Sequence, residues 1–300
     1  MTICVAVQVN DCLVFAADSA VTLTYGSDPN GQEIINVFPH GNKVFNLHRD
    51  LPICAMTCGL GNLGPESTAI LAKDLRIKLM GGDASYALDP SNYTIEEVAE
   101  KTRKFLFDEK FSQLPVKPQT HLNFYIGGYS SGADAPERWL VRIESEKNHS
   151  PAPERLGAPG EGGLSWGGQP EAINRLVMGI SGNYAEALAA ENIDPAVGAP
   201  IITAVQNHCQ VYLVSAAMPV QDAINLADFL VETTKRFVRF LPGADIVGGE
   251  TDIAVVTKHE GFKWIKRKHF FSSHLNPSEV SYGTRYPVEK GKPGHSGGAS

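Results

Sequence analysis

The sequence predicts an α+β fold in which antiparallel β-sheets and helices form separate layers. Three observations lead to this class. Short apolar strand patterns open the chain, helical patterns with apolar stripes occupy its middle, and strand patterns return near residue 251. Runs of strands followed by runs of helices are typical of α+β proteins with antiparallel sheets. A helix–sheet–sheet–helix stack accommodates this order.

The first element is a β-hairpin over residues 2–18, which read T-I-C-V-A-V-Q-V-N-D-C-L-V-F-A-A-D. Two β-branched, apolar runs flank an Asn10-Asp11 turn, which is a hairpin pattern. A three-residue loop centred on Asn10 would place Asp18 directly opposite Thr2, with Cβ atoms about 4.5–5.5 Å apart. A two-residue loop would instead pair Thr2 with Ser19. We expect the first register.

The remaining elements follow from apolar periodicity and turn residues. One helix begins at Thr94, where T-I-E-E forms a capping box with Glu97. In chain order we expect a loop over 23–42, strands over 42–47 and 52–57, a helix over 65–80, the helix from Thr94, strands over 121–129 and 138–143, a loop over 145–163, helices over 170–192, 200–217 and 219–241, and a hairpin over 251–266. We expect one domain over 1–270 and a disordered tail over 271–300, which is polar and rich in Gly, Pro and Ser.

Composition indicates an acidic cytoplasmic protein. The chain has 300 residues, 33 of them acidic and 26 basic, for a net charge of −7. This balance argues against nucleic-acid binding. No apolar run is long enough for a transmembrane helix, and no basic segment of a signal peptide opens the chain. The five cysteines are odd in number and four lie in apolar surroundings, so we expect buried thiols.

Thr2 is the first candidate for chemistry. An initiator Met before a small residue is commonly removed, which would leave Thr2 with a free α-amine beside its hydroxyl. The α-amine has an ordinary pKa of about 7.7–8.0, so part of it is neutral at pH 7 and can accept a proton. A neighbouring base is what a threonine hydroxyl needs to become a nucleophile.

Two other motifs suggest chemistry less strongly. G-L-S-W-G at 163–167 fits a nucleophile elbow at Ser165, but a Pro/Gly-rich loop precedes it where a strand is needed. Cys54 and Cys58 resemble a metal pair, but the chain has no second pair at metal-site spacing. We therefore expect no metal and no cofactor.

Four segments in order resemble the β subunits of the proteasome, and most closely the bacterial proteasome-homologue subunits. They are Thr2, A-A-D-S at 16–19, N-K-V-F at 42–45 and C-G-L-G at 58–61, and the resemblance returns at 248–262. It implies the fold of the N-terminal-nucleophile (Ntn) hydrolases, a four-layer αββα sandwich of two antiparallel sheets flanked by helices.

The resemblance also implies roles for four residues. Thr2 matches the nucleophile, Asp18 the aspartate sixteen residues later, and Lys43 the active-site lysine. Gly59 matches the glycine whose N–H stabilises the oxyanion. A buried lysine favours a neutral amine beside it, and a carboxylate keeps that lysine charged.

The sequence departs from the family in three places. The interval from Asp18 to Lys43 is 25 residues, longer than usual, so segment 23–42 carries an insertion. The supporting serine of the family is replaced by Gly167, with Ser165 two residues earlier. The late aspartate falls near Ala244, with Asp245 next to it. The supporting roles of Ser165 and Asp245 therefore stay open.

The expected function is that of a threonine-type endopeptidase that acts on peptides or unfolded proteins inside a homo-oligomer of stacked rings. Any energy-dependent unfolding of substrates would have to come from a separate ATPase, because the chain has no nucleotide-binding motif. One alternative is a non-catalytic ring-forming or binding subunit, in which Met1 is retained. Another is a transpeptidase, which passes the acyl group from Thr2 to an amine.

Overall fold

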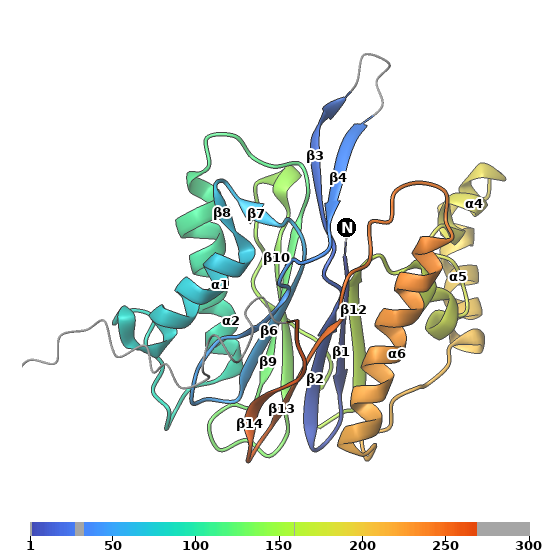
Figure 1. Ribbon diagram of the computed structural model, residues 1–300. Helices are drawn as coiled ribbons and strands as arrows, with labels where there is room; N and C mark the ends of the chain where they lie inside the picture. The colour runs from blue at the N-terminus through green and yellow to red at the C-terminus, as the bar shows by residue number, and fades with distance from the viewer. Residues whose placement is uncertain (1, 28–32, 159, 269–300) are drawn as a thin grey trace, which may run out of the picture. The chain divides into compact units, whose positions relative to one another are not determined.

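The computed structural model describes residues 2–27, 33–158 and 160–268. The predicted α+β class with antiparallel sheets is confirmed in these residues (Figure 1). One five-stranded sheet has the order β12 (Gly163–Gly168), β1 (Ile3–Gln8), β2 (Cys12–Ala17), β13 (Asp252–Thr257) and β14 (Gly261–Lys266). The second has the order β11 (Glu154–Arg155), β10 (Glu137–Ile143), β9 (Leu122–Gly128), β6 (Ile53–Gly59) and β5 (Val44–Asn46).

Helices cover the outer face of each sheet, as Figure 1 shows. The second sheet is covered by α1 (Thr68–Ile77), which continues as a π-helix over Lys78–Gly82, and by α2 (Ile95–Arg103), which continues as a π-helix over Lys104–Lys110. The first sheet is covered mainly by α6 (Val220–Arg239). Before α6 lie α3 (Glu171–Ile173) with a π-helical turn over Asn174–Met178, then α4 (Tyr184–Ala190) and α5 (Pro195–Cys209). Short 3₁₀ turns occupy Phe111–Gln113 and Ser145–Lys147.

Three apolar clusters follow from the alternation of side chains along the strands. In β1, Val5 faces α6 while Cys4 and Ala6 face the second sheet. In β6, Ala55 faces α1 and α2 while Met56 faces the first sheet. Both faces of each sheet are therefore buried, which explains why these strands are apolar at nearly every position.

Helices α1, α2 and α6 form near their predicted positions, whereas α5 begins five residues before and ends eight residues before the helix predicted over 200–217. Pro219 precedes α6, and an apolar stripe that includes Ala223 and Leu230 is buried against the first sheet. The Thr94 hydroxyl accepts a hydrogen bond from the Glu97 N–H at 3.0 Å, as a capping residue does.

The predicted hairpin register is wrong by one residue. Strands β1 and β2 pair Cys4 with Ala17, which is the register of the two-residue loop. Asp18 therefore lies opposite Ile3, and their backbones are joined by a bond from the Asp18 N–H to the Ile3 carbonyl at 3.2 Å. The Asn10-Asp11 dipeptide by itself closes the turn, as such dipeptides do in two-residue hairpins.

Two segments predicted as loops contain strands. Within 23–42, β3 (Val21–Ser27) and β4 (Glu33–Phe38) form an antiparallel hairpin. Within the loop predicted over 145–163, β11 adds an edge strand to the second sheet, and β12 begins at its last residue and adds an edge strand to the first. The sequence around these strands is rich in turn-forming residues, so local propensity does not predict them. They form because neighbouring strands supply their hydrogen-bond partners.

Two further predictions concern the helix over 170–192 and the tail over 271–300. The expected helix over 170–192 is divided into short pieces by Gly179, whose φ is +75°. The predicted tail over 271–300 lies outside the described residues, so the domain boundary at 270 stays a prediction.

Candidate functional site

A pocket of about 300 Å³ lies where the chain enters β1 and β5 and leaves β6. Thr2, Lys43 and Gly59 all line it, together with residues of the 40–42 segment and the start of α1. Three of the four residues that the sequence singles out thus share one cavity, and the fourth, Asp18, is bonded to Lys43 behind it.

Thr2 is held in place by strand β12. Its side chain is buried, and its carbonyl accepts a hydrogen bond of 2.6 Å from the Gln169 N–H. Gly168 has a φ of +99°, and a Cβ atom there would lie 1.8 Å from the Thr2 carbonyl oxygen. Only glycine permits this close approach of the two backbones.

Asp18 is the most heavily bonded residue near the pocket. Its Oδ1 accepts hydrogen bonds from the Ile3 N–H at 3.0 Å and the Lys43 ammonium at 2.6 Å. Its Oδ2 accepts bonds from the N–H groups of Ala20 at 3.1 Å and Gly248 at 3.0 Å. Asp18 lies one residue beyond β2, and its carboxylate accepts a bond from the N–H two residues later, which forms a local turn. The direction of the carboxylate is therefore not set by the alternation of side chains along the strand.

Lys43 reaches Asp18 from the second sheet. It directly precedes β5 and only 6% of the residue is exposed. Burial lowers the pKa of Lys43 below its ordinary value, and the attraction of Asp18 opposes that shift. The ammonium group is therefore both paired and close to the cavity that Thr2 lines.

Gly59 ends β6 with its backbone turned toward the pocket. The Leu60 N–H bonds to the His121 carbonyl beside β9, while the Thr57 N–H bonds to the Lys43 carbonyl on the opposite side. Because successive N–H groups of a strand point to alternate sides, the Gly59 N–H points the same way as that of Thr57. Strand β5 begins at Val44, so the Gly59 N–H lies beyond its end and faces the cavity.

A second buried ion pair supports this region, and the sequence did not predict it. Lys268 and Asp252 are bonded side chain to side chain, and each side chain is 3% exposed. The Lys268 ammonium also donates to the Ser19 hydroxyl at 2.7 Å, next to Asp18. The one feature of the sequence that could have indicated this pair is a lysine two residues beyond the last predicted strand.

A thiol pair lies directly behind the pocket. Cys4 of β1 donates a hydrogen bond of 3.6 Å to the Gly167 carbonyl, and its thiol interacts with that of Cys58 of β6 in the facing sheet. The neighbouring Cys4 thiol lowers the pKa of Cys58, whereas burial raises that of Cys4. Cys58 lines the pocket, and it precedes Gly59 in the chain.

Ser165 and Asp245 are not part of the pocket. Ser165 lies inside β12, paired with Ala6, and its hydroxyl accepts a bond of 2.6 Å from the Arg138 guanidinium. It is not at a strand-to-helix turn, so the nucleophile-elbow hypothesis is wrong. Asp245 is exposed in the segment after α6, while the Gly248 N–H supplies the contact to Asp18.

In the described part of the chain, no three His, Cys, Asp or Glu side chains gather as metal ligands would. None of the helices in that part combines the length and the apolar character needed to cross a bilayer.

No family model and no curated protein matches the chain. Two solved structures are similar to it at low identity. A helical assembly of the Anbu complex from Pseudomonas aeruginosa aligns with 16% identity and a TM-score of 0.47, covering 91% of this chain and 90% of that one. Anbu (ancestral beta-subunit) from Yersinia bercovieri aligns with 16% identity and a TM-score of 0.47, covering 89% and 88%.

These comparisons correct one prediction. The assignment to the bacterial proteasome-homologue subunits, as relatives of the proteasome β subunits, is wrong. These structural neighbours are Anbu complexes, and neither family models nor curated proteins support a β subunit. The geometry of the pocket rests on the contacts within this chain and is unchanged by that correction.

Proposed function

We propose that the chain is an N-terminal-nucleophile hydrolase that cleaves peptide bonds with Thr2. The observation that carries the proposal is the grouping of Thr2, Lys43 and Gly59 around one pocket, with Asp18 bonded to Lys43. The facing sheets covered by helices support the corresponding four-layer αββα fold.

The proposal requires that Met1 is removed, so that Thr2 carries a free α-amine. Lys43, which lines the same pocket, would repel a proton on that amine and lower its pKa. The neutral amine would accept the proton of the Thr2 hydroxyl as its oxygen attacks the peptide carbonyl. Asp18 would hold Lys43 charged and in place through the 2.6 Å bond.

The Gly59 N–H would stabilise the oxyanion, because it is a fixed donor aimed into the cavity. Collapse of the tetrahedral intermediate breaks the C–N bond, and the leaving amine takes the proton from the Thr2 ammonium. The acyl group then sits as an ester on Thr2. Water attacks this ester and gives a proton to the amine, which passes it to the Thr2 oxygen as the ester bond breaks and the acid is released.

The test is the intact mass of the purified protein before and after treatment with a peptide epoxyketone, which reacts with an amine and a hydroxyl on adjacent carbons. We expect a mass short by one Met and a single adduct that is absent from Thr2→Ala. Thr68→Ala is the matched control, since Thr68 lines the same pocket but donates its hydroxyl to the Gly61 carbonyl. Retention of Met1 without any adduct would overturn the proposal.

We also propose that the chain assembles with copies of itself. Large apolar side chains are exposed on and after α5, including Ile201 at 40% and Tyr212 at 82%. Exposed apolar surface of this kind marks interaction sites. Light scattering should give a multiple of the 32.4 kDa chain mass, and Ile201→Glu combined with Tyr212→Glu should reduce it. A monomeric wild-type chain would refute this part. The separate ATPase and the cytoplasmic location stay predictions.

A further inference from the structure

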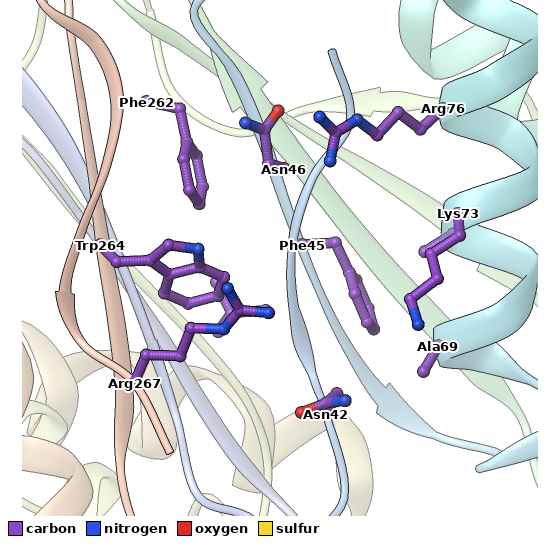
Figure 2. Close-up of a pocket in the computed structure, with 11 residues that line it drawn as sticks. Asn42, Phe45, Asn46, Ala69, Lys73, Arg76, Phe262, Trp264 and Arg267 are labelled. Carbon is purple, nitrogen blue, oxygen red and sulfur yellow. The ribbon is translucent and has the colours of Figure 1, made fainter. Parts of the chain in front are cut away.

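A second pocket, of about 210 Å³, adjoins the one that contains Thr2. Asn42 and Ala69 line both cavities, so the two share these walls. We call it the basic pocket, defined by Asn42, Lys73, Arg76, Phe262, Trp264 and Arg267 (Figure 2). Figure 2 shows Lys73 and Arg76 on one side and Trp264 and Arg267 on the other.

The charge of the basic pocket is one-sided. Lys73, Arg76 and Arg267 contribute three cations, and no carboxylate is among the described residues that line it. Within the described part of the chain these three make no hydrogen bond or ion pair; Arg267 lies over the Trp264 ring at 4.7 Å. Arg76 is half-buried. Burial lowers its pKa, the nearby Arg49 lowers it further and the nearby Asp50 raises it.

The apolar and hydrogen-bonding surroundings favour a peptide in this pocket. It lies between β5 and β14, which are the edge strands of their sheets. Edge strands offer unpaired N–H and C=O groups to an extended chain. The rings of Phe262 and Trp264, which meet edge to face at 5.1 Å, provide an apolar wall, and the Asn42 amide can bond to a peptide backbone.

The spacing along α1 relates the cations to the Thr2 pocket. Lys73 is four residues beyond Ala69 and Arg76 is seven beyond it, distances of about 6 and 10 Å along a helix. An extended peptide advances about 3.3 Å per residue. A peptide that passes Ala69 would therefore bring its second and third following residues beside these cations.

We propose that the basic pocket is a subsite for acidic side chains of the peptide substrate, two to three residues beyond the one at Ala69. This inference rests on the proposed function, because it assumes that the substrate enters the Thr2 pocket. It adds a substrate class, which is peptides with glutamate or aspartate near the cleaved bond. Guanidinium groups pair with carboxylates in a planar, two-point geometry, and Arg76 and Arg267 supply two of them.

The test measures peptide binding to Thr2→Ala by calorimetry, so that it does not depend on turnover. Four nine-residue peptides would be used, with a Glu-Glu or a Gln-Gln pair placed either before or after the central residue. We expect one Glu-Glu peptide to bind at least about fivefold more tightly than its Gln-Gln twin, with the advantage lost at high salt.

The matched variants are Lys73→Gln/Arg76→Gln and Lys147→Gln/Arg175→Gln, each added to Thr2→Ala. Both remove two cations, but Lys147 and Arg175 are 72% and 57% exposed elsewhere on the chain. The preference should fall to about one in the first variant and persist in the second. Equal binding of the twins, or a preference unchanged in the first variant, would overturn the inference. If the preference is lost in the first variant as expected but the wild-type chain does not cleave any of the four peptides, the subsite stands and the proposed peptidase activity alone is refuted.

Discussion

The Lys43 ammonium donates a hydrogen bond of 2.6 Å to Asp18 Oδ1, and this bond joins the two sheets directly behind the pocket. Asp18 is 0% exposed and also accepts three backbone N–H bonds. The pair therefore links the end of β2 to the start of β5 and connects both to Gly248. Its loss should affect stability as well as any chemistry.

Asp18→Asn should lower the free energy of unfolding by about 3 kcal/mol or more. The amide nitrogen would face N–H donors where the carboxylate accepts bonds, and the Lys43 ammonium would lose its partner. Urea unfolding measures the change. Asp134→Asn is the control, because Asp134 pairs with Lys258 while its side chain is 94% exposed, and it should cost at most about 0.5 kcal/mol. Equal costs would contradict the role of burial.

The pH dependence of stability should carry the signature of Lys43. Its pKa is lowered by burial in the folded chain, so the unfolded chain binds the proton more readily. The free energy of unfolding should therefore rise with pH between the lowered pKa and the ordinary value of 10.5. Subtracting the urea-unfolding curve of Lys43→Met from that of wild type, pH by pH, isolates this contribution. A difference that falls as pH rises would show that the shift has the opposite sign.

Lys268→Met should destabilise the chain by about 3 kcal/mol, since it leaves the Asp252 carboxylate buried without its ion-pair partner. Lys258→Met removes a lysine of a comparable Lys–Asp pair whose lysine is 38% exposed. We expect that change to cost at most about 0.5 kcal/mol. The comparison uses chemical denaturation of both variants, and a similar cost in each would count against a structural role for the buried pair.

Gly168→Ala should displace Thr2 and be severely destabilising, because the new Cβ would lie 1.8 Å from the Thr2 carbonyl oxygen. Gly81→Ala separates this clash from backbone strain. Gly81 has the same φ of +99° but has nothing within 4 Å of the added Cβ, so it should cost about 1 kcal/mol. Thermal melting of the two variants decides the matter. Equal melting temperatures would show that the contact with Thr2 does not matter.

Cys58 should react with a small alkylating reagent faster than Cys4, Cys12 or Cys54. It lines the pocket and its pKa is lowered by the Cys4 thiol beside it, whereas burial raises the pKa of the other three. Cys209 is exposed, so the experiment needs a Cys209→Ser background. Peptide mapping after timed iodoacetamide treatment gives the rates. Cys4→Ala should slow labelling of Cys58, and an unchanged or faster rate would contradict the thiol pair.

The sequence by itself determined the local elements and the residues worth following. The apolar runs around Asn10-Asp11 specify a hairpin, and the stripe after Pro219 specifies α6. The family resemblance of Thr2, Asp18, Lys43 and Gly59 singled out four residues, of which three line one pocket and the fourth, Asp18, is bonded to Lys43 behind it. These features are readable because turn chemistry and apolar periodicity act over a few residues.

Tertiary structure alone decided the strands β3, β4 and β12 and every contact between segments that are distant in the sequence. Strand β12 is rich in glycine and forms because β1 offers it a partner and needs its small residues for close approach. The Lys268–Asp252 pair and the basic pocket join segments that no local pattern connects. Burial and pairing of charges depend on which surfaces the fold brings together, and that is a property of the packed chain and not of any short stretch.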